Sequence, residues 1–74
     1  MTPAQCRAAR ALANLSIVEL AAAARVPVAS VCDFESGIAP HMRSQADIDA
    51  MQAALERAGV QVIPGVVKLR KSGK

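Results

Sequence analysis

Few side chains in this sequence have types and spacings that could support catalysis or metal binding. Cys6 and Cys32 are far apart in the chain, and together with His41 they could supply at most three metal ligands. That set fits neither a zinc site nor a disulfide framework. The sequence also has no serine–histidine–aspartate arrangement and no glycine-rich phosphate loop. We therefore expect no enzymatic activity, no metal and no cofactor, with Cys6 buried and Cys32 a free thiol.

The residues from Ser16 to Gly37 predict two short helices joined by a tight turn. Ser16 is a favourable N-cap, and Glu19 stands three residues later, which is the spacing of a capping box. Pro27 prevents the first helix from continuing but suits the start of a second, and Gly37 favours the end of that helix. Two helices joined by a three- or four-residue turn form a helix-turn-helix, whose second helix commonly enters the DNA major groove.

This stretch resembles the helix-turn-helix of the phage repressor and Cro family, the XRE-like regulators. The resemblance extends approximately from Thr2 to Val60. The residues that carry it are Arg10, Leu12, Leu15, Ser16, Glu19, Leu20, Ala21, Val26, Val31, Phe34, Glu35 and Gly37. It implies a mainly α fold, a lambda-repressor-like bundle of four or five helices, with binding to double-stranded DNA and formation of a homodimer. It also implies an ion pair between Arg10 and Glu35, which sequence spacing alone would not reveal.

The resemblance places the DNA-binding surface at the start of the first helix of the motif, along the second helix and in the loop that follows. The candidate residues are Ser16, Ile17, Pro27, Val28, Ala29, Ser30, Asp33 and Arg43. Bases are commonly read by Arg, Lys, Asn and Gln, and none of these lies between Val28 and Asp33. In that segment Ser30 could form one hydrogen bond, Asp33 could accept one from cytosine, and the apolar residues could contact a thymine methyl group.

Two hypotheses about function therefore remain open. In the first, the protein is a small transcriptional regulator that reads DNA by apolar contacts and shape. In the second, the helix-turn-helix is a protein-interaction module, of the anti-activator or antitoxin kind, that binds another regulatory protein. The second hypothesis depends on apolar residues on the expected DNA face: Ile17, Val18, Val28, Ala29 and Ile38. Of these, Val18 and Ile38 could instead turn inward and fill the core.

Two residues in the turn depart from the family pattern. Arg25 stands where glycine is usual, so either this residue adopts the left-handed conformation at a cost of roughly 1–2 kcal/mol or the turn changes shape. Pro27 stands where a capping serine or threonine is common, and the loss of such a cap costs roughly 0.5–2 kcal/mol.

The positive charge of the chain is concentrated at its C-terminal end. The formal net charge is +3 over 74 residues, but four of the nine basic residues lie in the last seven positions. The other 67 residues hold five basic and six acidic side chains. Nonspecific contacts with phosphates are therefore expected mainly from the tail, with Arg7 and Arg43 as further candidates.

The remaining pattern predicts a small core and three segments. We expect helices over residues 3–13, 17–24, 28–36 and 46–58. The residues expected to face the core from the first and last of these helices are Cys6, Ala9, Leu12, Ala13, Ile48, Met51, Ala54, Leu55 and Ala58. Residues 1–59 then form the helix-turn-helix domain, residues 60–70 a strand pair or an extended segment, and residues 71–74 a disordered basic tail.

The C-terminal segment is expected to depend on a partner. Two runs rich in β-branched residues flank Pro64-Gly65, but this dipeptide favours a type II turn, which suits a two-residue hairpin poorly. We therefore expect the segment to pair with its copy in a second chain or to fold loosely. A homodimer is also favoured because alanine supplies much of the 53% apolar content, Phe34 is the one aromatic residue and the core is small.

With no signal peptide and no membrane span in the sequence, we expect a cytoplasmic protein.

Overall fold

Four helices and a two-stranded antiparallel sheet make up the residues that the computed structural model describes, 1–37 and 44–69. The elements are α1 (Pro3–Ala13), α2 (Ile17–Ala24), α3 (Val28–Ser36), α4 (Gln45–Arg57), β1 (Val60–Ile63) and β2 (Val66–Leu69). The expectation of a mainly helical chain with a C-terminal hairpin is therefore confirmed. The last helix begins and ends one residue earlier than predicted.

Side chains cap the starts of α1, α2 and α4. The Thr2 side chain accepts a hydrogen bond from the Gln5 amide and the Gln5 side chain accepts one from the Thr2 amide, so a capping box opens α1. Ser16 and Glu19 form the same arrangement at α2. The Ser44 hydroxyl accepts from the Asp47 amide at the start of α4. The box at Ser16 and Glu19 is the one expected from the sequence, and its bonds could be predicted because they are local.

The C-terminal segment forms a hairpin within one chain, which corrects the expectation that it pairs with a second copy or folds loosely. Val60 pairs with Leu69 and Ile63 with Val66, so Pro64 and Gly65 form a two-residue turn in which Gly65 has φ 75°. Contacts with the helices stabilise the hairpin. Val60 and Val62 are buried, and the Gln5 side chain donates a hydrogen bond of 2.7 Å to the Ile63 carbonyl.

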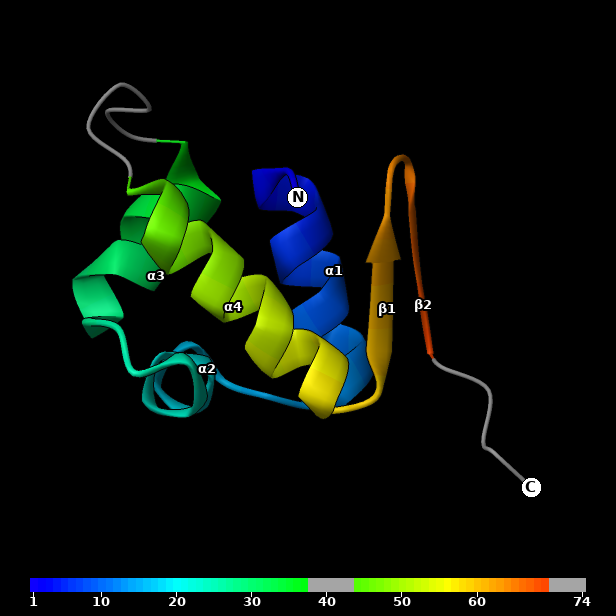
Figure 1. The fold of residues 1–74 in the computed structure, drawn as a ribbon, viewed down its shortest axis with the longest axis horizontal. Coiled ribbons are helices and arrows are strands. Elements are labelled where there is room, and N and C mark those ends of the chain that lie inside the picture. The colour runs from blue at the N-terminus through cyan, green and yellow to red at the C-terminus, as the bar shows by residue number, and fades with distance from the viewer. Residues whose placement is uncertain (38–43, 70–74) are drawn as a thin grey trace.

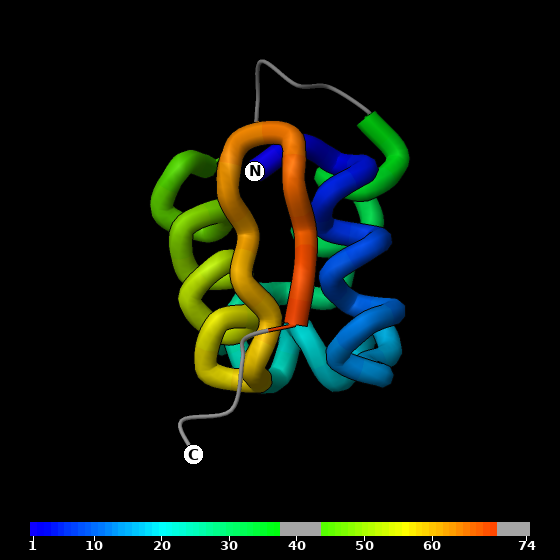
Figure 2. Tube along the Cα trace, turned by 90° about the vertical axis from the view of Figure 1, so that its right-hand side faces the viewer, coloured from blue at the N-terminus to red at the C-terminus, as the bar shows by residue number. Residues whose placement is uncertain are grey.

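The hairpin packs against α1 and α4, at the opposite end of the molecule from α3 (Figures 1 and 2). One face of β1 points inward, since Val60 and Val62 are buried while Gln61 and Ile63 are exposed. β2 is mostly exposed. In the described parts of the chain, none of the helices combines the length and the apolar character needed to span a lipid bilayer.

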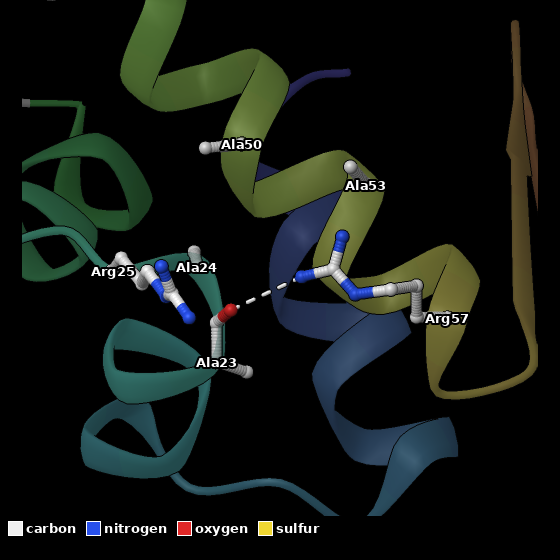
Figure 3. A pocket seen from close by; sticks show the side chains of 6 residues that line it. All are labelled: Ala23, Ala24, Arg25, Ala50, Ala53 and Arg57. Carbon is white, nitrogen blue, oxygen red and sulfur yellow. Dashed lines mark hydrogen bonds between the residues drawn. The ribbon is translucent and has the colours of Figure 1, made fainter.

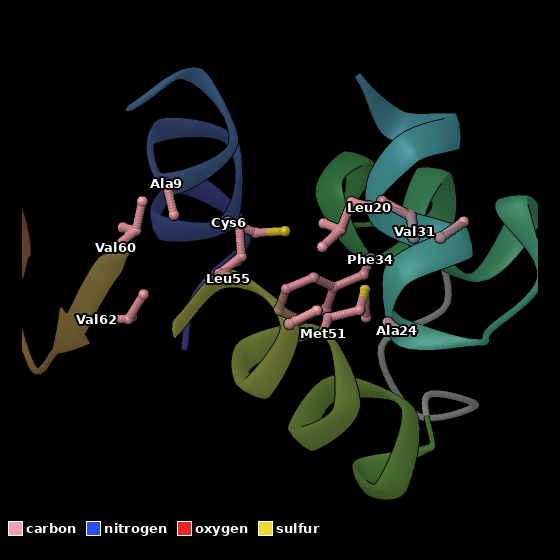
Figure 4. Packing of buried hydrophobic residues seen from close by; sticks show 12 residues of the cluster. Cys6, Ala9, Leu20, Ala24, Val31, Phe34, Met51, Leu55, Val60 and Val62 are labelled. Atoms are coloured by element: carbon pink, nitrogen blue, oxygen red, sulfur yellow. The ribbon is translucent and has the colours of Figure 1, made fainter. Parts of the chain in front are cut away.

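The core lies where α1, α2, α3, α4 and β1 meet (Figure 4). Its largest members, Leu20, Phe34, Met51 and Leu55, converge from three helices, while Cys6 and Ala9 close it from α1. Ala54 is also buried, and Ala13 and Ile48 are partly buried against the core.

Two residues predicted to face the core are exposed. Leu12 is 42% exposed, because the packed stripe of α1 runs through Cys6 and Ala9 and leaves Leu12 beside it. Ala58 is exposed because it lies one residue beyond the end of α4, where the chain turns toward β1.

Candidate functional site

A three-residue connection joins α2 to α3, and its conformation sets the angle between them. Arg25 adopts the left-handed conformation, with φ 59° and ψ 43°. The amide of Val26 then donates to the Ala21 carbonyl at 3.0 Å, which is the long hydrogen bond of a Schellman motif. Of the two outcomes expected for Arg25, the structure shows the left-handed residue.

Helix α3 starts without a side-chain cap. Pro27 occupies the N-cap position and forms no side-chain hydrogen bond there, as its chemistry requires. The first turn is held by the Ser30 amide, which donates to the Pro27 carbonyl at 3.0 Å. Behind this turn Val31 and Phe34 are buried and fix α3 against the core.

The predicted DNA-binding residues differ in how far they reach the surface. Ser16, Pro27, Val28, Ala29 and Asp33 are exposed, and Ser30 is partly buried. The Ser16 hydroxyl accepts a hydrogen bond from the Glu19 amide. Ile17 is partly buried against the core, so less of it is presented to a partner than the sequence suggested. Arg43, His41 and Ile38 lie outside the described residues.

The exposed residues of α2, α3 and the connection between them are mostly apolar, with two acidic residues and one basic residue. Val18 is 62% exposed and Val28 41% exposed, so the alternative in which Val18 turns inward is wrong. Asp33 and Glu19 are exposed on α3 and α2, and Arg25 is the exposed cation between the two helices. This composition offers hydrophobic contact and few hydrogen-bond donors.

An ion pair holds α3 against α1. Glu35 is 6% exposed, and its carboxylate receives two parallel hydrogen bonds from Arg10, the residue that the resemblance pairs with it. The distances are 2.7 Å from Nε to Oε2 and 2.9 Å from Nη2 to Oε1. Arg10 Nη1 also donates to the Leu15 carbonyl at 3.0 Å. One guanidinium therefore joins α1, α3 and the α1–α2 connection.

Two further residues of α1 contact Glu35, and the sequence did not reveal either contact. The Cys6 thiol donates to Glu35 Oε2 at 3.2 Å. Arg7 Nη1 donates to the backbone carbonyl of Glu35, in the last turn of α3, where carbonyls lack partners within the helix. Arg7 is exposed, as expected, and it is also bound to α3.

This network shifts the ionisation of both Glu35 and Cys6. Burial alone would raise the pKa of Glu35, but the hydrogen bonds from Arg10 and Cys6, with the positive charges of Arg10 and Arg7, lower it. Burial, followed by the hydrogen bond to Glu35 and the charge of Glu35, raises the pKa of Cys6 to about 12. Cys6 is buried, and both cysteines are free thiols.

Searches for this chain among models of known protein families and among curated protein sequences find no match.

Proposed function

We propose that this protein is a small DNA-binding transcriptional regulator that uses α2 and α3 as a helix-turn-helix. The observation that supports this most strongly is the arrangement of these helices: a three-residue connection, a buried Val31 and Phe34 behind α3, and an exposed first turn in front. A helix held in this way can be inserted into the major groove while its other side stays packed.

The exposed residues indicate how such a protein would read DNA. The methyl groups of Val28 and Ala29 can contact a thymine methyl group, and the Asp33 carboxylate can accept a hydrogen bond from a cytosine amino group. None of these contacts is bidentate, so discrimination between bases is weak. Affinity then depends on contacts with phosphates from cations outside the described residues: Arg43, Arg70, Lys71 and Lys74.

A dimer would compensate for weak reading by each subunit. Two copies on a pseudo-palindromic site present two α3 helices, with about 34 Å between half-sites that are one helical turn apart. The hairpin lies far from α3 (Figure 1), so association at that end leaves both α3 helices free to contact DNA.

The proposal is tested by fluorescence anisotropy against genomic fragments with competitor DNA at two salt concentrations. Specific binding that survives competitor and weakens steeply with salt is expected. Ala29→Glu should reduce affinity by more than about tenfold, because it places a like charge against the phosphates. Ala11→Glu, at an exposed alanine of α1, is the matched control and should have a much smaller effect. Equal losses in the two variants would contradict a DNA-binding role for α3.

A second candidate function is favoured by the exposure of Val18 and Val28 on a surface with few cations. Such a surface suits a protein partner better than a polyanion. Under this alternative α2 and α3 form an interaction module. The same titration separates the two, because an interaction module would bind DNA only nonspecifically and only through its basic tail. Removal of residues 70–74 would then abolish DNA binding altogether.

A further inference from the structure

A pocket with two arginines at its edge lies between the end of α2 and the second half of α4 (Figure 3). Its volume is about 540 Å³, and it is open to solvent. Ala23, Ala24, Ala50 and Ala53 form walls of methyl groups, and Arg25 and Arg57 complete the lining. The pocket is separate from the exposed residues of α3 considered above.

Both guanidinium groups extend toward the same space (Figure 3). Arg57 Nη2 donates to the Ala23 carbonyl at 3.1 Å, which leaves most of the five N–H donors of that guanidinium without a protein acceptor in the described residues. Within residues 1–37 and 44–69, Arg10 and Glu35 form the sole ion pair, so neither pocket arginine has a carboxylate partner there. Both arginines are exposed, so their guanidinium groups are available as hydrogen-bond donors at the edge of the same pocket.

Arg25 adopts a backbone conformation that is unfavourable for a residue with a side chain, with φ 59° and ψ 43°. Glycine would avoid this strain. A cation near the carbonyls at the end of α2 recovers only part of the cost. Stabilisation of the helix end therefore does not account for arginine at this position. Strained positions of this kind often serve a site.

We propose that the pocket binds a small oxyanion, a carboxylate or phosphate ester, whose short apolar body lies against the alanine walls. Planar guanidinium groups bind carboxylate and phosphate oxygens through paired hydrogen bonds, and Arg25 and Arg57 both line this pocket. Because the site is open and the ligand small, the affinity is modest, with a Kd on the order of 1–10 mM. This inference does not depend on DNA binding by α3.

The test is an NMR titration of the whole protein, following its backbone amides. Sodium phosphate and sodium butyrate are the probes, and sodium chloride at the same ionic strength is the reference. Saturating shifts are expected at the amides of Ala23, Ala24, Ala50 and Ala53 with both probes and not with chloride. Butyrate should bind more tightly than acetate, because its alkyl chain contacts the alanines. Shifts no larger than those in chloride would overturn the proposal.

Matched variants separate the site from the fold. Arg25→Gly and Asn14→Gly each place glycine at a left-handed helix end, so neither should unfold the protein, but only Arg25→Gly removes a pocket cation. Arg25→Gly should weaken butyrate binding at least fivefold. Asn14→Gly should change it less than twofold, and Arg57→Lys should weaken it about twofold to fivefold. Equal binding by the two glycine variants would overturn the proposal.

A further titration distinguishes binding of a free small anion from binding of the phosphates of DNA. A short DNA duplex is added in place of the small anions, and the same four alanine amides are followed. If these amides respond to phosphate and butyrate but not to the duplex, the pocket serves a small ligand. A response to the duplex alone would overturn the inference and assign both arginines to contacts with the DNA backbone.

Discussion

Glu35 is the single buried charged side chain in the described part of the chain, and its carboxylate connects α1 to α3. Two hydrogen bonds from Arg10 and one from Cys6 satisfy most of its acceptor sites. A buried carboxylate is tolerated only with such partners, because an unpaired one is very costly. The position of α3, and so of any surface it presents, depends on this residue.

Replacement of Glu35 by glutamine should strongly destabilise the fold. The amide keeps the size of the side chain but removes the charge, so Arg10 is left partly buried without its counter-ion. The expected loss is about 3–5 kcal/mol in the free energy of unfolding, measured by urea denaturation. Asp33→Asn, at an exposed residue of the same helix, should change stability by less than about 0.5 kcal/mol. Similar losses in both variants would exclude a special role for the ion pair.

The lowered pKa of Glu35 also predicts a loss of stability in acid. A carboxyl group whose pKa is lower in the folded protein than in the unfolded chain stabilises the fold fully at pH above the unfolded value, here near 4.5. That contribution is lost as the pH falls through the folded pKa. Thermal unfolding should therefore shift to lower temperature below about pH 4.5. The Glu35→Gln protein should lack this contribution, and parallel pH profiles for the two proteins would contradict the prediction.

The two cysteines should differ in reactivity. Cys6 is buried with a pKa of about 12, so almost no thiolate is available at pH 8, whereas Cys32 is partly exposed. Ellman's reagent should titrate one thiol rapidly in the folded protein and both in urea. Cys32→Ser should remove the rapid phase. Rapid reaction of two thiols in the native state would show that the α1–α3 contact opens readily.

At the scale of the elements, the turn between β1 and β2 decides whether the hairpin closes. Gly65 has φ 75°, and a β-carbon added there would meet no atom within 4 Å, so a substitution acts through the backbone alone. Gly65→Ala should cost about 1–2 kcal/mol, seen as a lower melting temperature. Gly65→Asn should cost clearly less, because asparagine tolerates the left-handed conformation. Equal effects of the two variants would contradict this explanation of the turn.

The hairpin also illustrates how packing overrides local preference. The Pro-Gly turn suits a two-residue hairpin poorly, and an isolated pair of short strands is marginal in water. Burial of Val60 and Val62 against the helices, with the hydrogen bond from Gln5 to Ile63, provides the missing stability. A second chain is not needed for the strands to pair.

At the scale of the whole molecule, four large apolar side chains are exposed on α1 and the hairpin: Leu12, Ile63, Val66 and Leu69. We propose that they contribute to a dimer interface, since a domain of this size buries only about 60% of its unfolded surface. Sedimentation equilibrium should detect self-association at micromolar concentration. Val66→Thr with Leu69→Thr should weaken it while the circular dichroism spectrum is unchanged, and Val18→Thr should not. A native protein that stays monomeric at high concentration would contradict the dimer.

The sequence by itself determined where the helices begin and end to within one residue, and which positions of α3 face outward. Capping boxes, αL residues and helical periodicity involve residues within a few positions of each other, so their physics is readable from the chain. The pairing of Arg10 with Glu35 came from the family resemblance, because those residues are 25 positions apart.

Only the tertiary structure decided the contacts between distant elements. The bond from Arg7 to Glu35, the bond from Arg57 to Ala23 and the pocket that Arg57 shares with Arg25 each join residues at least 28 positions apart. The packing of the hairpin against the helices and the partial burial of Ile17 against the core were also decided by the tertiary structure. Such contacts depend on how whole helices are rotated and packed, and local preferences do not fix that rotation.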